Sequence, residues 1–209
     1  MPDTAIKIPL TLEERLPYGE EFIVEADWDT FLNILEKGEY PVQYDEGKML
    51  SFMGYGTEEH EALVGEIIRL LGNLLANQSY KVYGSNLALH LPGEGKKYYN
   101  ADCSIIKGQP EKISIRGEMK AIANPIFLVE VLSKSTHNFD LWQKFQRYKT
   151  IPSLQQLLYI DSREQRVISY RKQDMKGTWL IEEFVDSEAS VPVLEEGNLI
   201  VKDIYKALK

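Results

Sequence analysis

The sequence predicts an α/β (α+β) fold, in which a mixed β-sheet is flanked by helices on both faces. Residues 126–132 form an apolar run of strand length, and residues 58–77 carry apolar side chains at helical spacing. Helical and strand-like segments alternate along the 209 residues, and 44% of the residues are hydrophobic, which is enough for one large core. We therefore expect a single domain over residues 26–209, preceded by an arm over residues 1–25.

The composition limits the compartment and the chemistry. The single cysteine, Cys103, excludes an internal disulfide framework and a cysteine-rich zinc site, and it favours a reducing cytoplasm. The sequence shows no charged-then-apolar leader and no apolar run of about 18 residues, so neither export nor a membrane span is expected. The expected location is cytoplasmic.

The charge is unevenly distributed. A net charge of −8 argues against a general polyanion binder. However, residues 1–95 hold 6 Lys+Arg and 17 Asp+Glu, whereas residues 96–176 hold 15 and 8, a balance of +7. The basic part can offer a local positive surface, or both parts are ordinary solvated faces, and the counts leave both interpretations open.

The first elements are predicted to be an arm, a helix and a hairpin. Residues 1–25 are polar with scattered prolines and are expected to be irregular. Asp27 or Asp29 can cap a helix over roughly 28–37. Residues 40–44 and 49–53 are then expected to form a hairpin that turns at Gly47, and residues 54–56 a glycine-rich loop.

The clearest helix covers residues 58–77. Thr57 is a good N-cap, and Glu58 and Glu59 suit the positive end of the helix dipole. His60 lies on the apolar stripe of this helix. From the sequence alone, a histidine hydrogen-bonded to a neighbour at the end of a core face is favoured over a ligand or a base.

The middle of the chain is predicted to be mainly strands. Residues 80–91 and 98–107 are expected to form two strands, and residues 108–124 a polar connection. Alternation in the second strand places Asp102, Ser104 and Ile106 on one face and Ala101, Cys103 and Ile105 on the other.

The apolar run at 126–132 is predicted to be a strand buried on both faces, although it contains Glu130. Burying a lone carboxylate costs several kcal/mol unless a cation or another partner pairs with it. A helix over roughly 138–149 follows, with Thr136 or Asn138 as its cap. A buried strand is expected at 155–161. A hairpin around Lys176-Gly177 should follow at 165–171 and 178–185, and a short terminal helix should begin at Asp203.

Three side chains could form a catalytic site. Asp102 and Glu130 lie on separate predicted strands. Lys144 lies on the following helix, on one face with Asp140 and Tyr148. Two carboxylates can hold a hard cation such as Mg²⁺, and a lysine beside them can stabilise developing charge. Spacing alone nevertheless favours ordinary ion pairs and a strand-end hydrogen bond over a metal site.

A larger pattern surrounds these residues. It consists of Asp102, then Leu-Val-Glu130-Val-Leu-Ser133 with Ser135-Thr136, then Asp140-x-x-x-Lys144-x-x-x-Tyr148, then a strand ending in Tyr-Ile-Asp161. As a set, this pattern resembles the bacterial Uma-two family of proposed restriction endonucleases, within the PD-(D/E)XK nuclease superfamily. The resemblance covers roughly residues 28–170, including the helix that opens at His60.

The resemblance implies a restriction-endonuclease-like core and hydrolysis of a DNA phosphodiester. It implies Mg²⁺, with Mn²⁺ as a substitute, bound by Asp102 and Glu130. We expect Lys144 to complete the catalytic set. The accessory candidates around these three are His60, Glu66, Ser133, Lys134, Asp140 and Tyr148.

The chain departs from the superfamily pattern in three places. Ala101 stands where a proline usually precedes the aspartate, and Lys134 stands where the family has proline. The superfamily lysine, expected two residues after Glu130, is replaced by Leu132. Lys144 is our first choice as a relocated lysine, because its helix can direct the side chain back to the strand end, and Lys134 is the second.

Three functional hypotheses follow from these observations. The first is a metal-dependent DNA endonuclease. The second is a nucleic-acid-binding module of the same fold without turnover, which Leu132 motivates, and the third is a protein-interaction domain, which the acidic net charge motivates. Under the first two, DNA is the partner. A homodimer is also a reasonable expectation, because nucleases that cut both strands often match the two-fold symmetry of the duplex.

Overall fold

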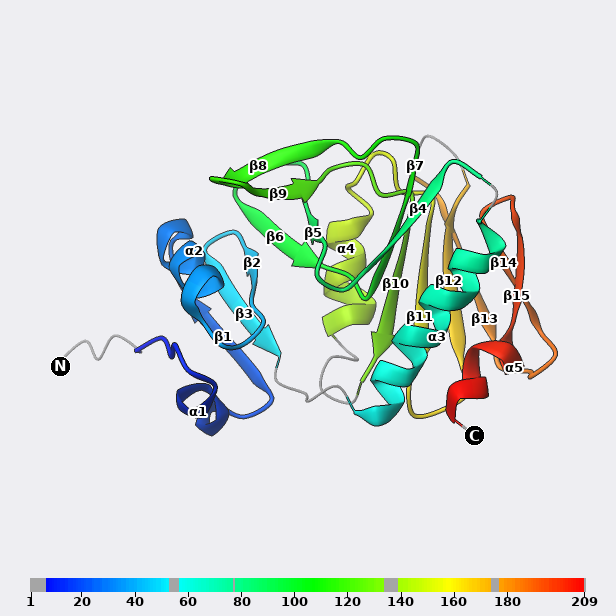
Figure 1. Cartoon of the computed structure of the whole chain (residues 1–209), viewed down its shortest axis with the longest axis horizontal. Coiled ribbons are helices and arrows are strands. Elements are labelled where there is room, and N and C mark those ends of the chain that lie inside the picture. The colour runs from blue at the N-terminus through cyan, green and yellow to red at the C-terminus, as the bar shows by residue number, and fades with distance from the viewer. Residues whose placement is uncertain (1–6, 53–56, 77, 134–138, 174–176, 209) are drawn as a thin grey trace.

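A computed structural model of the chain describes residues 7–52, 57–76, 78–133, 139–173 and 177–208, except for the side chains of residues 139–141. Figure 1 shows two sheets that lie side by side, with helices packed against them. The predicted α+β architecture, a mixed sheet flanked by helices, is confirmed. In the described residues, no helix is long and apolar enough to cross a membrane.

The strands fall into three sheets. The seven-stranded sheet contains β1 (Glu21–Glu25), β2 (Gln43–Asp45), β3 (Lys48–Phe52), β5 (Ala88–Leu89), β6 (Lys97–Asn100), β8 (Lys112–Arg116) and β9 (Met119–Ile122). The six-stranded sheet contains β4 (Tyr80–Gly84), β7 (Cys103–Lys107), β10 (Phe127–Leu132), β11 (Gln156–Asp161), β12 (Val167–Lys172) and β13 (Trp179–Phe184). A separate pair consists of β14 (Ser190–Val193) and β15 (Gly197–Ile200).

The helical segments are short except for two. The α-helices are α1 (Leu12–Arg15), α2 (Trp28–Lys37), α3 (Glu58–Leu74), α4 (Phe145–Tyr148) and α5 (Val201–Ile204). Two 3₁₀ turns, η1 (Leu16–Tyr18) and η3 (Tyr205–Leu208), accompany α1 and α5, and a π-helical turn, η2 (Phe139–Lys144), leads directly into α4.

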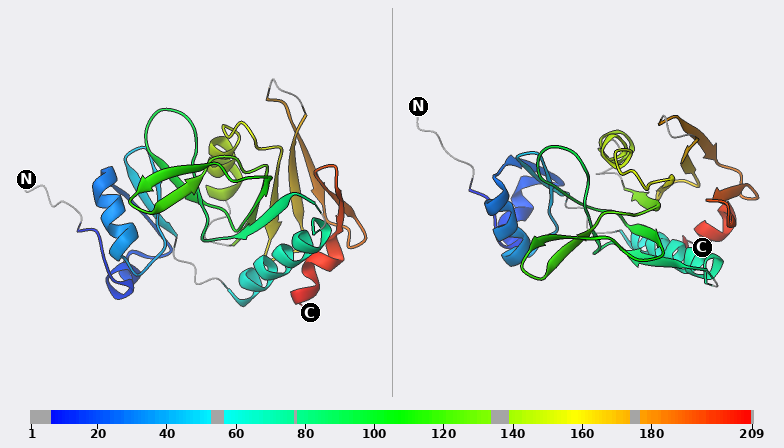
Figure 2. Two further views of the ribbon diagram at one scale, coloured as in Figure 1. Left: turned by 45° about the horizontal axis from the view of Figure 1, so that its top comes forward. Right: turned by 90° about the horizontal axis from the view of Figure 1, so that it is seen from above.

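The six-stranded sheet is built around β10. Every residue of β10 is buried, as the sequence predicted, and so is every residue of β11, its parallel neighbour. On its other side β10 pairs antiparallel with β7. Helix α3 packs on one face of this sheet and α4 on the other (Figure 2), so alternate β10 side chains enter two separate cores.

Helices α2 and α3 confirm the two clearest helical predictions. The Asp27 carboxylate caps α2 by accepting a hydrogen bond of 2.7 Å from the Thr30 amide. The Thr57 hydroxyl caps α3 in the same way through the His60 amide. The helix expected over 138–149 is present as η2 and α4, while its proposed caps Thr136 and Asn138 lie outside the described residues.

The predicted hairpins at Gly47 and over β12 and β13 are also confirmed. The β2–β3 turn needs left-handed backbone at both central residues, and Glu46 and Gly47 have φ angles of 48° and 94°. Lys176 and the glycine-rich loop at 54–56 lie outside the described residues.

The irregular lead-in predicted for residues 1–25 is wrong in its second half. Residues 12–18 form α1 and η1, and residues 21–25 form β1. Phe22 and Val24 alternate into a core, which makes this segment a strand, and the fully buried Arg15 donates to the Ser51 hydroxyl and carbonyl of β3. Whether residues 1–25 are a separate unit stays a prediction.

The long strands predicted over 80–91 and 98–107 are each two strands. The chain leaves the six-stranded sheet after Gly84 and enters it again at Cys103, so β4 and β7 lie in one sheet while β5 and β6 lie in the other. The expected alternation from Ala101 through Cys103 fails for the same reason, since Ala101 enters the core beneath α4 and Cys103 the core beneath α3.

Further strands lie in the polar connection predicted over residues 108–124 and in residues 190–200, for which no element was predicted. Residues 108–124 include the β8–β9 hairpin, whose sequence is polar because most of its side chains face solvent. The β14–β15 pair precedes a terminal helix that begins at Val201 rather than at Asp203.

Candidate functional site

Glu130 is the buried carboxylate at the centre of the site. It lies on β10 on the α4 side and is 2% exposed. The Lys144 ammonium is 2.8 Å from Glu130 Oε2, and the Tyr148 hydroxyl donates to Glu130 Oε1 at 2.6 Å. A carboxylate at this depth is costly unless it is paired and hydrogen-bonded, and these two contacts meet that requirement.

The helical segment after β10 explains why both partners reach Glu130. Lys144 is the last residue of η2 and Tyr148 is the last residue of α4, so they are four positions apart and share one face. That face packs on the sheet, because Lys144 and Tyr148 are 6% and 0% exposed. The Tyr148 hydroxyl is also 3.3 Å from the Asn100 carbonyl, at the end of β6.

Asp102 lies where the chain enters the six-stranded sheet, immediately before β7. Cys103 pairs with Val129, so Asp102 comes next to the following residues of β10. Its Oδ2 atom accepts the Val131 amide at 2.7 Å, which replaces the hydrogen bond that a longer β7 would have made. Among the described residues, no donor reaches Asp102 Oδ1.

His60, in the first turn of α3, lies beside Asp102. Its Nε2 atom is 3.5 Å from Asp102 Oδ2, and its Nδ1 atom is 3.2 Å from Glu61 Oε1. Burial lowers the His60 pKa, but the contacts with Asp102 and Glu61 outweigh burial and raise the pKa to about 9. The histidine is therefore charged at neutral pH. It is hydrogen-bonded to neighbours, as the sequence favoured, and one neighbour is a candidate metal ligand.

The structure does not bring all the accessory candidates together. Glu66 makes a two-pronged contact with Arg69 of α3 rather than with this cluster. Ser133 directly follows β10. Lys134 and the Asp140 side chain lie outside the described residues. Leu132, at the usual lysine position, is 1% exposed within the core under α4.

One contact beside the site was not predicted. Arg147 of α4 donates from Nε and Nη2 to Asp45 Oδ2, at 3.0 Å and 2.6 Å, across 102 positions of sequence. Asp45 belongs to the β2–β3 hairpin, so this ion pair fixes α4 against the other sheet. Sequence periodicity carries no signal for such a distant pair.

The donor set fits a hard divalent cation. Asp102 offers one carboxylate oxygen that receives no hydrogen bond from the described residues, and Glu130 lies on the adjacent strand. Mg²⁺ is usually held by one or two carboxylates and retains several waters. The described residues contain no group of three His, Cys, Asp or Glu side chains placed to hold a metal.

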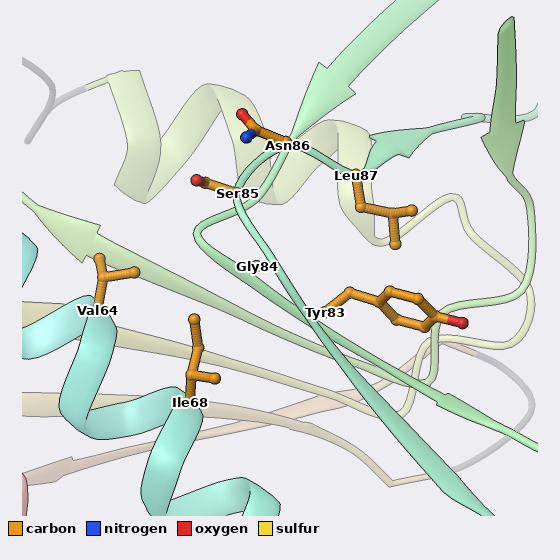
Figure 3. Close-up of a pocket in the computed structure, with 7 residues that line it drawn as sticks. All are labelled: Val64, Ile68, Tyr83, Gly84, Ser85, Asn86 and Leu87. Carbon is orange, nitrogen blue, oxygen red and sulfur yellow. The ribbon is translucent and has the colours of Figure 1, made fainter.

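An open pocket of about 450 Å³ lies between α3 and the end of β4 with the loop that follows it. Figure 3 shows Val64 and Ile68 extending from α3 toward the loop that carries Ser85 and Asn86. Val64 is one turn after His60, and Gly84 of the pocket pairs with Cys103, the residue after Asp102. Two lining residues are thus near His60 along α3 or near Asp102 across the sheet, but neither His60 nor Asp102 lines the pocket.

The fold is that of a restriction-endonuclease-like protein. A crystal structure from Anabaena variabilis ATCC 29413, titled as "a putative nuclease belonging to DUF820", has the same fold. It aligns with a TM-score of 0.66 and 24% identity, over 88% of this chain and 99% of that chain. At this identity the likeness establishes the fold alone.

The chain belongs to the Uma2 family, described as "Putative restriction endonuclease", which its sequence matches over residues 28–199. Two relatives come from Synechocystis sp. (strain ATCC 27184 / PCC 6803 / Kazusa). "Uncharacterized protein sll1609" is 32% identical over 149 residues, or 71% of this chain and 81% of the relative. "Uncharacterized protein slr1290" is 29% identical over 139 residues, or 66% and 70%. The family membership supports a nuclease-like function.

Proposed function

We propose that this protein is a Mg²⁺-dependent DNA endonuclease. The observation that carries the proposal is the buried Glu130 carboxylate of β10, paired with Lys144, with Asp102 immediately before the neighbouring strand β7. Three ionisable groups around a central strand are expensive to maintain for stability alone. They match the acid, acid and lysine set that hydrolysis of a phosphodiester requires.

Asp102 and Glu130 are the proposed ligands of the cation. When bound, Mg²⁺ would supply charge neutralisation at the phosphate and a more acidic water. Mn²⁺, which takes the same oxygen ligands, is the expected substitute.

The protein side chains have separate roles in this proposal. Lys144 places a positive charge within 2.8 Å of Glu130, where it can orient a water and stabilise charge that develops on the phosphate. Tyr148 holds the other Glu130 oxygen and so fixes the rotamer of the carboxylate. The charged His60, held by Asp102, adds a second cation on the α3 side of the site.

DNA is the proposed partner in a reducing cytoplasm. The basic balance of residues 96–176 supplies positive charge on an otherwise acidic chain, and phosphate contacts dominate affinity for nucleic acid. Cys103 is fully buried, and burial raises its pKa to about 12, so it is an unreactive thiol with no part in the chemistry.

The test is cleavage of supercoiled and linear DNA in Mg²⁺ and in Mn²⁺. Wild type should cut both substrates, and Glu130→Gln and Lys144→Met should lose at least a hundredfold in rate, as removal of a transition-state contact typically does. Glu66→Gln is the matched control, because Glu66 contacts Arg69 instead of the site. If Lys144→Met still cuts and Lys134→Met does not, the lysine assignment is wrong. If wild type binds DNA in a salt-dependent way but cuts in neither metal, the protein is a binding module.

A further inference from the structure

Strand β13 is a free edge of the six-stranded sheet, at the end remote from the N-terminus (Figure 2). All six of its residues pair with β12. No described residue outside β12 makes a backbone hydrogen bond to β13. An edge of this kind is a ready template for another strand, and proteins usually protect it with charge, proline or a covering segment.

The centre of β13 is apolar and exposed. Ile181 is 57% exposed and Leu180 is 38% exposed. Ile181 lies opposite Tyr170 in the sheet, and the Tyr170 ring packs on Phe145 of α4 with centroids 4.5 Å apart. Trp142, one turn before Phe145, is 67% exposed. Apolar side chains are therefore exposed both at this sheet edge and on η2, the helical turn that leads into α4.

We infer that β13 pairs antiparallel with β13 of a second copy of this chain, with the two-fold axis at Ile181. This register places Ile181 against Ile181 of the second copy. Each Glu182 then faces Leu180 of the second copy, and each Glu183 faces Trp179. No two like charges are directly opposite, so this register avoids direct charge repulsion across the axis.

The charges beside the axis are already compensated within one chain. Arg171 of β12 forms an ion pair with Glu182, and Arg166 forms one with Glu183. The two glutamates therefore leave little net charge to repel a second copy. The pairing would remove the exposed isoleucine from water and satisfy the outer backbone groups of β13.

Two other edge strands would place like charges opposite each other if they paired with a second copy. Strand β1 also has an exposed isoleucine at its centre, Ile23, but pairing with itself there would bring Glu21 against Glu25 of the second copy. Strand β8 would bring Lys112 against Arg116. Like charges directly opposite destabilise a strand pair, so this criterion favours β13 over β1 and β8.

The first experiment measures the mass of the full chain by sedimentation at high micromolar concentration. Wild type should sediment at about 48 kDa, twice the 24.0 kDa of one chain. Ile181→Lys should sediment at the mass of one chain, because it places two ammonium groups at the axis, and Ile23→Lys, the same change on β1, should remain a dimer. A monomeric wild type, or a dimeric Ile181→Lys, would overturn the inference.

The second experiment tests the register. Residues directly opposite in an antiparallel pair are close enough for a disulfide, so Ile181→Cys should form a covalent dimer under mild oxidation, whereas Ile23→Cys should not. The native Cys103 is fully buried and gives little background. A dimeric Ile181→Cys that does not cross-link would refute the axis at Ile181. Both measurements are independent of nuclease activity.

Discussion

Replacing Lys144 with methionine is the most informative single change. Methionine keeps the length and apolar stem of the side chain but removes the Lys144 ammonium from the Glu130 carboxylate, which is 2% exposed. At 2.8 Å and an effective dielectric constant of about 20, the attraction between these two charges is about 6 kcal/mol. Part of this is offset because the variant no longer buries an ammonium, and a net loss of about 3–5 kcal/mol in unfolding free energy is typical.

The assay is urea unfolding followed by tryptophan fluorescence. Lys7→Met is the matched control, since Lys7 contacts Glu14 at 2.9 Å but its side chain is 82% exposed, and its unfolding midpoint should not change. The double variant Glu130→Gln with Lys144→Met should be more stable than Lys144→Met alone, because no buried charge remains unpaired. Equal midpoints for Lys144→Met and Lys7→Met would refute the reasoning.

Three further changes test other parts of the account. In metal-free buffer, the unfolding free energy of wild type should fall by on the order of 3 kcal/mol as pH rises from about 6.5 to 9, because protonated His60 stabilises the fold and loses its proton over this range. His60→Gln should lack this fall, and identical pH profiles for the two proteins would contradict the prediction. Thr57→Ala should cost about 1 kcal/mol in thermal unfolding by removing the α3 cap, whereas Thr57→Ser should cost much less. Arg15→Met should cost about 2–3 kcal/mol in urea unfolding, because Arg15 is fully buried and joins α1 to β3, and an unchanged midpoint would show that this contact does not hold the N-terminal segment.

Elements specified by local chemistry were predictable from the sequence. β10 is a buried apolar run, α3 has a cap and an apolar stripe, and the turn at Gly47 needs left-handed backbone. The strand breaks at Gly84 and Asp102 were not predictable, because they depend on which sheet each half joins. The residues on both sides of each break remain suitable for strands, so no local signal marks the crossing.

In the candidate site, too, contacts between residues close in sequence were predictable and contacts between distant elements were not. Lys144 and Tyr148 follow β10 within a few turns, so the sequence could predict that one helical face points back at Glu130. The contact between His60 and Asp102 depends on how α3 packs across the sheet, and the Arg147–Asp45 pair joins two sheets. Contacts of this kind follow from the assembled fold rather than from the spacing of residues.

The most direct test of the central claim is Mn²⁺ binding to the DNA-free protein, followed by electron paramagnetic resonance. The account predicts one bound Mn²⁺ per chain, competed by Mg²⁺ and lost in Asp102→Asn, while Glu66→Gln binds as wild type does. A wild type that binds no Mn²⁺, or an Asp102→Asn variant that binds it unchanged, would contradict the assignment of Asp102 and Glu130 as a metal centre.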